Sequence, residues 1–154
     1  LLDQTVDFRE LASRALGEHW KARTDAEREE FMGLLRDLLR ENYQDKLTGR
    51  MESEDYTITY VDERVRRDRA IVKTSVTYDD VTKPVDYKMM NKEAGWIVYD
   101  LLIDDISLEE TYRDSYTEII EEDGWSGLID LMKERLAEMR AEKAKDAAGD
   151  SDAE

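Results

Sequence analysis

The sequence contains no cysteine, one histidine and one proline. The absence of cysteine excludes disulfides, thiolate nucleophiles and cysteine-ligated metals. A single histidine, His19, with no cysteine beside it gives too few ligands for a typical transition-metal site. It is also a weak basis for predicting a Ser-His-Asp triad. We therefore expect no metal site, no cofactor and no catalytic residue, and we assign His19 a packing or surface role.

Long apolar runs and basic stretches are also missing. No run of about 18 apolar residues occurs, so no segment is predicted to span a membrane. The 154 residues include 23 Lys and Arg against 39 Asp and Glu, for a formal net charge of −16. Nucleic acid is therefore not an expected partner, because phosphate backbones require clustered cations. We also expect neither a signal peptide nor a glycine-rich phosphate loop within these residues.

The apolar pattern changes period along the chain. Helical spacing covers residues 6–16 and 24–43, and a capping box, Thr24 with Glu27, opens the second of these segments. Alternation typical of strands then covers residues 56–61, 72–78, 85–90 and 96–103. Helical spacing returns after Ser107, which forms a second capping box with Glu110, and it breaks at Gly124 and Gly127 before a last helix. In that last helix Arg135 stands among the apolar positions Leu128, Leu131, Met132, Leu136 and Met139.

This order predicts an α+β domain with a four-stranded antiparallel curved sheet that is covered on its concave face by helices. Short polar connections favour antiparallel neighbours. We expect one domain over residues 1–143 and a disordered acidic tail over residues 144–154, where large apolar residues are absent. No heptad seam is present, so we expect a monomer.

The fourth predicted strand carries more apolar surface than one strand face requires. Residues 96–103 read WIVYDLLI. A small domain with apolar residues on both faces of a strand must cover both faces or leave one facing a cavity. We predict that one face of this strand lines a cavity, and that the cavity holds lipid tails.

Polar residues offer fewer functional signals. Asp100 interrupts the apolar strand, and it either acts as a general base or, more simply, pairs with a cation or caps a turn. Arginines 64, 66, 67 and 69 form a basic island at the first hairpin, which is either a solvated turn or a docking spot. Tyrosines are frequent in the predicted sheet and the following helix. Each either lies at the rim of a lipid site, where its apolar ring and polar hydroxyl are both useful, or reflects the general preference of strands for aromatic residues.

Four stretches give the chain a resemblance to the MlaC, or toluene-tolerance auxiliary, family. They are residues 15–31 (ALGEHWKARTDAEREEF), 84–87 (PVDY), 95–113 (GWIVYDLLIDDISLEETYR) and 124–129 (GWSGLI). The family pattern has glycine where Asp105 stands, and the strong negative charge is also atypical of the family. Family members carry a further helical segment before the position of Leu1, and we expect that segment to be missing from this chain.

The resemblance implies a cystatin-like or NTF2-like fold and a periplasmic phospholipid carrier of an ABC transport system. It implies shuttling between an outer-membrane lipoprotein complex and an inner-membrane transporter with an MCE-domain protein. Lipid tails would lie between the sheet and the helices. The residues expected to contact lipid are Leu35, Leu38, Val72, Val76, Val85, Tyr87, Met89, Trp96, Val98, Leu102, Tyr112 and Tyr116.

Two alternatives stay open at this point. The first is an NTF2-like enzyme of the isomerase or dehydratase type, which would act on a small hydrophobic substrate with Asp100 and a tyrosine as acid and base. The second is an interaction module that uses the same fold without a ligand.

Overall fold

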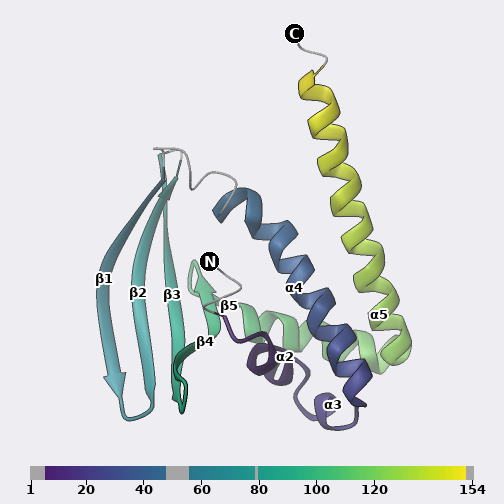
Figure 1. Cartoon of the computed structure of the whole chain (residues 1–154), viewed down its shortest axis with the longest axis horizontal. Helices are drawn as coiled ribbons and strands as arrows, with labels where there is room; N and C mark the ends of the chain where they lie inside the picture. The colour runs from purple at the N-terminus through teal and green to yellow at the C-terminus, as the bar shows by residue number, and fades with distance from the viewer. Residues whose placement is uncertain (1–5, 48–55, 79, 152–154) are drawn as a thin grey trace.

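The computed structural model describes residues 6–47, 56–78 and 80–151. Helices come first and last along the chain, and a sheet lies between them (Figure 1). The first helices are α2 (Phe8–Leu16), α3 (Glu18–Lys21) and α4 (Asp25–Leu47). The strands are β1 (Tyr56–Arg66), β2 (Arg69–Tyr78), β3 (Val81–Lys92), β4 (Gly95–Ile103) and β5 (Ile106–Ser107), and α5 (Leu108–Ser151) follows.

The sheet is an antiparallel meander in the order β1-β2-β3-β4-β5. The α+β class is confirmed, and the sheet has five strands instead of the expected four. The additional strand has two residues because α5 begins directly after it, at Leu108. It follows a two-residue turn, Asp104 and Asp105, in which both residues have positive φ, 54° and 64°. Such turns match the twist of paired strands, so Ile106 returns opposite Ile103 before α5 begins.

Local capping explains where the helices begin. The Asp7 carboxylate accepts a hydrogen bond from the amide of Glu10 at 3.0 Å and caps α2. Thr24 and Glu27 form the expected reciprocal capping box at the start of α4, with distances of 3.0 and 3.2 Å. The Ser107 hydroxyl accepts from the amide of Glu110 at 3.1 Å and caps α5.

Helix α5 consists of two arms, a first arm (residues 108–123) and a second arm (residues 125–151). They meet at Gly124, whose φ of 77° and ψ of 178° are not helical. Gly127 follows within the second arm, so only the first of the two expected break residues departs from helical geometry. The second arm is helical as far as Ser151, and the disordered tail expected over residues 144–154 stays a prediction. Alanine is the best helix former, and four alanines between residues 141 and 148 favour this continuation.

The apolar core joins the three longer helices to one strand. Phe31 of α4 lies at its centre and is fully buried. Its ring contacts Tyr116 of the first arm at 5.6 Å and Trp125 at the start of the second arm at 5.8 Å between centroids. Val98 of β4 belongs to the same core, and the segment before α2 pairs with β4 through an Asp7 amide to Val98 carbonyl hydrogen bond of 2.9 Å.

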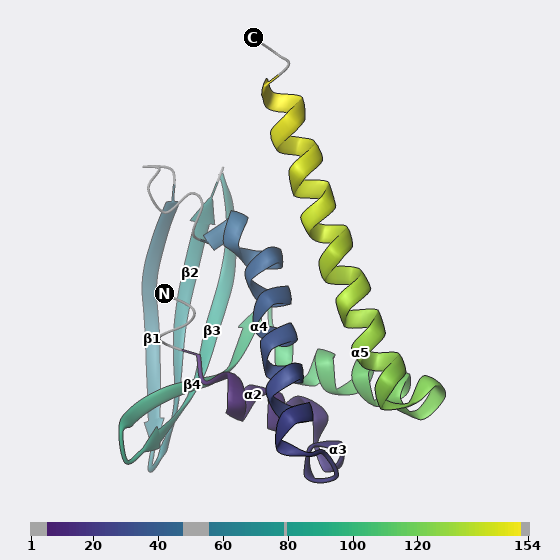
Figure 2. The same ribbon diagram turned by 45° about the vertical axis from the view of Figure 1, so that its right-hand side comes forward.

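Figures 1 and 2 show the same arrangement of layers, with α4 between the sheet and the second arm of α5. The helices contact the sheet chiefly at β4, through α2 and the first arm. Within the described residues, no helix combines the length and the apolarity needed to cross a membrane.

Gly124 provides a test of the kink. Its φ and ψ belong to a region populated essentially by glycine, so Gly124→Ala should lower the free energy of unfolding by roughly 1–3 kcal/mol. An added Cβ at Gly124 meets no atom within 4 Å, so the loss comes from the backbone alone. Gly33→Ala is the matched control inside α4, where the added Cβ is also free of contacts, and it should stabilise by roughly 0.5–1 kcal/mol. Urea denaturation measures both changes, and equal effects would contradict this account of the kink.

Candidate functional site

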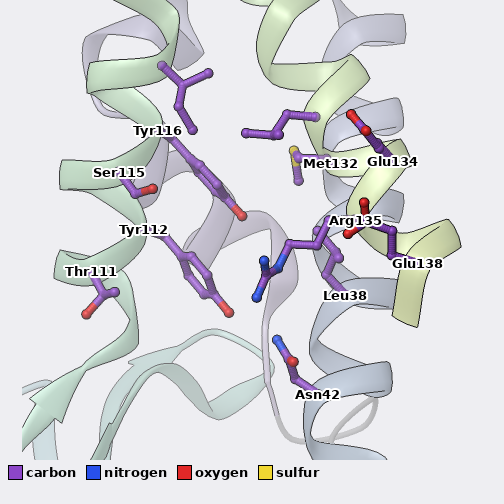
Figure 3. Close-up of a pocket in the computed structure, with 12 residues that line it drawn as sticks. Leu38, Asn42, Thr111, Tyr112, Ser115, Tyr116, Met132, Glu134, Arg135 and Glu138 are labelled. Atoms are coloured by element: carbon purple, nitrogen blue, oxygen red, sulfur yellow. The ribbon is translucent and has the colours of Figure 1, made fainter. Parts of the chain in front are cut away.

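A pocket of about 370 Å³ lies between α4 and the two arms of α5 (Figure 3). This volume falls within the range of about 300–1,000 Å³ that is typical of ligand pockets. The lining residues are Leu38, Asn42, Thr111, Tyr112, Ser115, Tyr116, Ile119, Leu131, Met132, Glu134, Arg135 and Glu138. All of them come from helices.

The buried side of the pocket is apolar. Leu38, Tyr116 and Met132 belong to the core and are nearly inaccessible. The rings of Tyr112 and Tyr116 stack at 5.3 Å between centroids, and Tyr112 is half-buried. Leu131 is 45 % exposed. The pocket therefore runs from an apolar interior to an accessible edge, as a site for an amphiphile requires.

Tyr116 brings a neutral hydroxyl into this apolar setting. Burial raises the pKa of the Tyr116 hydroxyl far above its ordinary value, and the positive charge of nearby Arg135 acts in the opposite direction. The hydroxyl consequently keeps its proton at neutral pH and can donate a hydrogen bond. Figure 3 shows the guanidinium of Arg135 extending from α5 toward Tyr112 and Tyr116.

Three residues expected to contact lipid, Leu38, Tyr112 and Tyr116, line this pocket. Leu35 is fully buried in the core beside it. The remaining eight residues belong to the sheet and do not line the pocket. The expected location between sheet and helices thus differs from the position of this pocket, which lies among helices alone.

The sheet residues gather on the face that turns toward the core. Residues opposite each other in an antiparallel pair share a face, and the register pairs Val72 with Tyr87 and Met89 with Val98. Tyr87 and Met89 pack against the core, whereas Val72, Val76 and Val85 are half-buried beyond it. Trp96, opposite Asn91, is 41 % exposed at the end of β4.

Leu102 does not share this inner face, contrary to the expectation from the sequence. Simple alternation along β4 places Leu102 on the same face as Val98, but Lys88 pairs with Asp100 and the next residue, Met89, pairs with Val98. Tyr99 is therefore an extra residue in β4, and a β-bulge of this kind reverses the faces beyond it. Leu101 takes the inner position, opposite Tyr87, and Leu102 lies on the outer face opposite Asp86.

The inner face continues across β1 as exposed apolar surface. Ile58 pairs with Val76, Tyr60 with Thr74, and Val65 with Ala70, so all three share the inner face. Their exposed fractions are 48 %, 58 % and 59 %. Since the helices contact the sheet chiefly at β4, the inner face of β1 and β2 is available to an apolar ligand.

Asp100 is buried and fully engaged by its neighbours. Its carboxylate accepts hydrogen bonds from the amides of Leu101 and Glu109 at 2.8 and 2.9 Å and from the Ser107 hydroxyl. Lys88 pairs with it at 3.7 Å. These contacts satisfy a buried charge at the start of α5, where the helix dipole also favours an anion.

The other polar candidates are His19 and the basic island at the first hairpin. His19 is half-buried in the short helix α3. Among the residues that the structure describes, no cluster of three or more His, Asp or Glu side chains could hold a metal ion. In the basic island Arg64 pairs with Asp62 at 3.7 Å and Arg69 lies over the ring of Tyr99, while Arg66 and Arg67 are exposed.

Several lining residues were absent from the expected set, above all Arg135, Met132 and Asn42. The signal for Arg135 was present in the sequence, because an arginine at a position of the apolar stripe must either leave the core or face a cavity. Nothing in the sequence indicated Asn42, since the pocket depends on how α4 meets α5.

Comparisons with known proteins bear on the fold and on the family of the chain. No curated protein matches the chain. The fold is similar to that of a phospholipid-binding protein from Ralstonia solanacearum, solved in complex with a phospholipid, with a TM-score of 0.81 and 25 % sequence identity over 90 % of this chain and 80 % of that one. The sequence matches the family described as MlaC protein over residues 1–134. The chain therefore belongs to the MlaC family.

Proposed function

We propose that this protein is a periplasmic phospholipid carrier that holds lipid tails in the pocket between α4 and α5. The observation that carries the proposal is the pocket itself, an apolar interior with an accessible edge, in a member of the MlaC family. The phospholipid bound to the structurally similar protein supports the same ligand class.

Tail burial supplies the affinity in this proposal. Each methylene removed from water contributes about 0.8 kcal/mol, so one 16-carbon chain contributes on the order of 10 kcal/mol before the costs of binding. The inner face of the sheet is proposed to receive the part of the lipid that the pocket cannot hold. Tyr87 and Met89 of that face pack against the same core as Leu38 and Tyr116.

Transport would consist of exchange between an outer-membrane lipoprotein complex and an inner-membrane complex with an MCE-domain protein. The acidic surface supports docking on protein partners, because a net charge of −16 is repelled by a bare anionic membrane. The enzyme alternative has less support, since both oxygens of Asp100 are occupied by backbone and side-chain donors.

Filling the pocket tests the carrier directly. Ser115 lines the pocket and is exposed, so Ser115→Trp should occupy the space of a tail and remove most of the bound phospholipid. Glu118→Trp is the matched control, on the same arm but outside the lining. Organic extraction of freshly purified protein with mass spectrometry measures lipid per protein. Wild-type protein that never contains phospholipid, even after incubation with vesicles, would overturn the proposal.

The role of the sheet is tested by a pair of neighbouring residues in β2. Val76→Glu places a carboxylate on the inner face and should reduce phospholipid loading, because a charge against lipid tails is unfavourable. Ser75→Glu places the same charge on the opposite face and should leave loading unchanged. Equal loading of both variants would remove the sheet from the lipid site.

Asp100→Asn distinguishes the carrier from an enzyme. The substitution removes a buried charge that accepts several hydrogen bonds, so it should lower the free energy of unfolding by roughly 1–3 kcal/mol while lipid retention survives. Asp114→Asn, at an exposed position of the first arm, should have little effect. Urea denaturation and lipid extraction are the two readouts. Loss of lipid from a still-folded Asp100→Asn protein would contradict a purely structural role.

A further inference from the structure

Arg135 differs from the three cations of the second arm of α5 that form ion pairs with α4. Lys133 pairs with Glu30 of α4 at 3.5 Å, Arg140 pairs with Glu41 at 3.6 Å, and Lys143 also pairs with Glu41, at 2.7 Å. These pairs fasten the second arm to α4. Arg135 forms no ion pair with any residue that the structure describes, and it lines the pocket.

Arg66 and Arg67 of the first hairpin also form no ion pair with any residue that the structure describes, but of these three arginines Arg135 alone lines the pocket. Glu134 and Glu138 line the same pocket, but neither lies within ion-pair distance of Arg135. Its guanidinium instead extends toward Tyr112 and Tyr116 (Figure 3). A cation kept at the accessible edge of an apolar pocket is available to an anionic group of the ligand.

We propose that Arg135 is the headgroup contact of the pocket and binds the phosphodiester of the phospholipid whose tails lie against Tyr116 and Met132. This assignment rests on the proposed function. The planar guanidinium presents donors in a fork that matches two phosphate oxygens. The neutral Tyr116 hydroxyl, beside the guanidinium, can add a further donor.

The surrounding charges favour a phosphate that is attached to lipid over free phosphate. The rim acids Glu134 and Glu138 repel a small anion in solution, whose only gain is its contact with Arg135. A phospholipid is held by its tails, so its phosphate reaches the guanidinium at a high effective concentration. Arg135 therefore serves to select phosphate-bearing amphiphiles among lipids with similar tails.

The experiment compares phosphatidylglycerol with diacylglycerol of the same chains, each supplied in vesicles to lipid-free protein. Wild type should load phosphatidylglycerol in preference to diacylglycerol. Arg135→Gln should lower affinity for phosphatidylglycerol about tenfold and leave diacylglycerol unchanged, because charge-assisted hydrogen bonds are lost only with the former. Arg135→Lys should give an intermediate loss, because it keeps the charge without the fork. Arg140→Gln, on the same arm, is the control and should retain the wild-type preference.

The outcomes separate this assignment from the function on which it rests. Wild type that loads neither lipid overturns the proposed carrier. Wild type and Arg135→Gln that load phosphatidylglycerol with equal preference overturn the role of Arg135 alone. Calorimetric titration with inorganic phosphate should give no measurable heat of binding, and tight binding of phosphate alone would replace the lipid headgroup with a free anion as the ligand of Arg135.

Discussion

The contact of Phe31 with both arms of α5 sets the geometry on which the pocket depends. One ring from α4 packs against Tyr116 on the first arm and Trp125 just after the kink. Because Phe31 is fully buried, it fixes the distance between α4 and each arm at the point where the arms diverge. The space that opens beyond this contact becomes the pocket, with Leu38 and Met132 on its walls.

The sheet contributes a different physical feature, an apolar face that the helices do not fully cover. Exposed Ile58, Tyr60 and Val65 would be unfavourable in a protein whose sheet only supports its helices. Their position on the inner face, in register with Val76 and Ala70, makes the exposed surface continuous instead of scattered. Such continuity is expected of a ligand surface, and it complements the smaller pocket among the helices.

Sequence periodicity was sufficient to predict the class, the order of elements and most helix starts, because these depend on local capping and on neighbours three or four residues apart. Thr24 with Glu27 before α4 and Ser107 before α5 are examples. The β-bulge at Tyr99 could not be predicted, since it depends on the register between β3 and β4, and it reversed the face of Leu102. The pocket was missed for the same reason, since it depends on the meeting of α4 with two arms of α5.

The location of the lipid tails is the central claim, and paramagnetic NMR tests it most directly. Methionine methyl resonances are recorded before and after loading with a phospholipid that carries a nitroxide near the end of one tail. Met132 lines the pocket, and Met90, on the outer face of β3, is the internal reference. This account predicts strong broadening of the Met132 methyl signal with little change at Met90. An unbroadened Met132 signal in a protein that has taken up the lipid would contradict it.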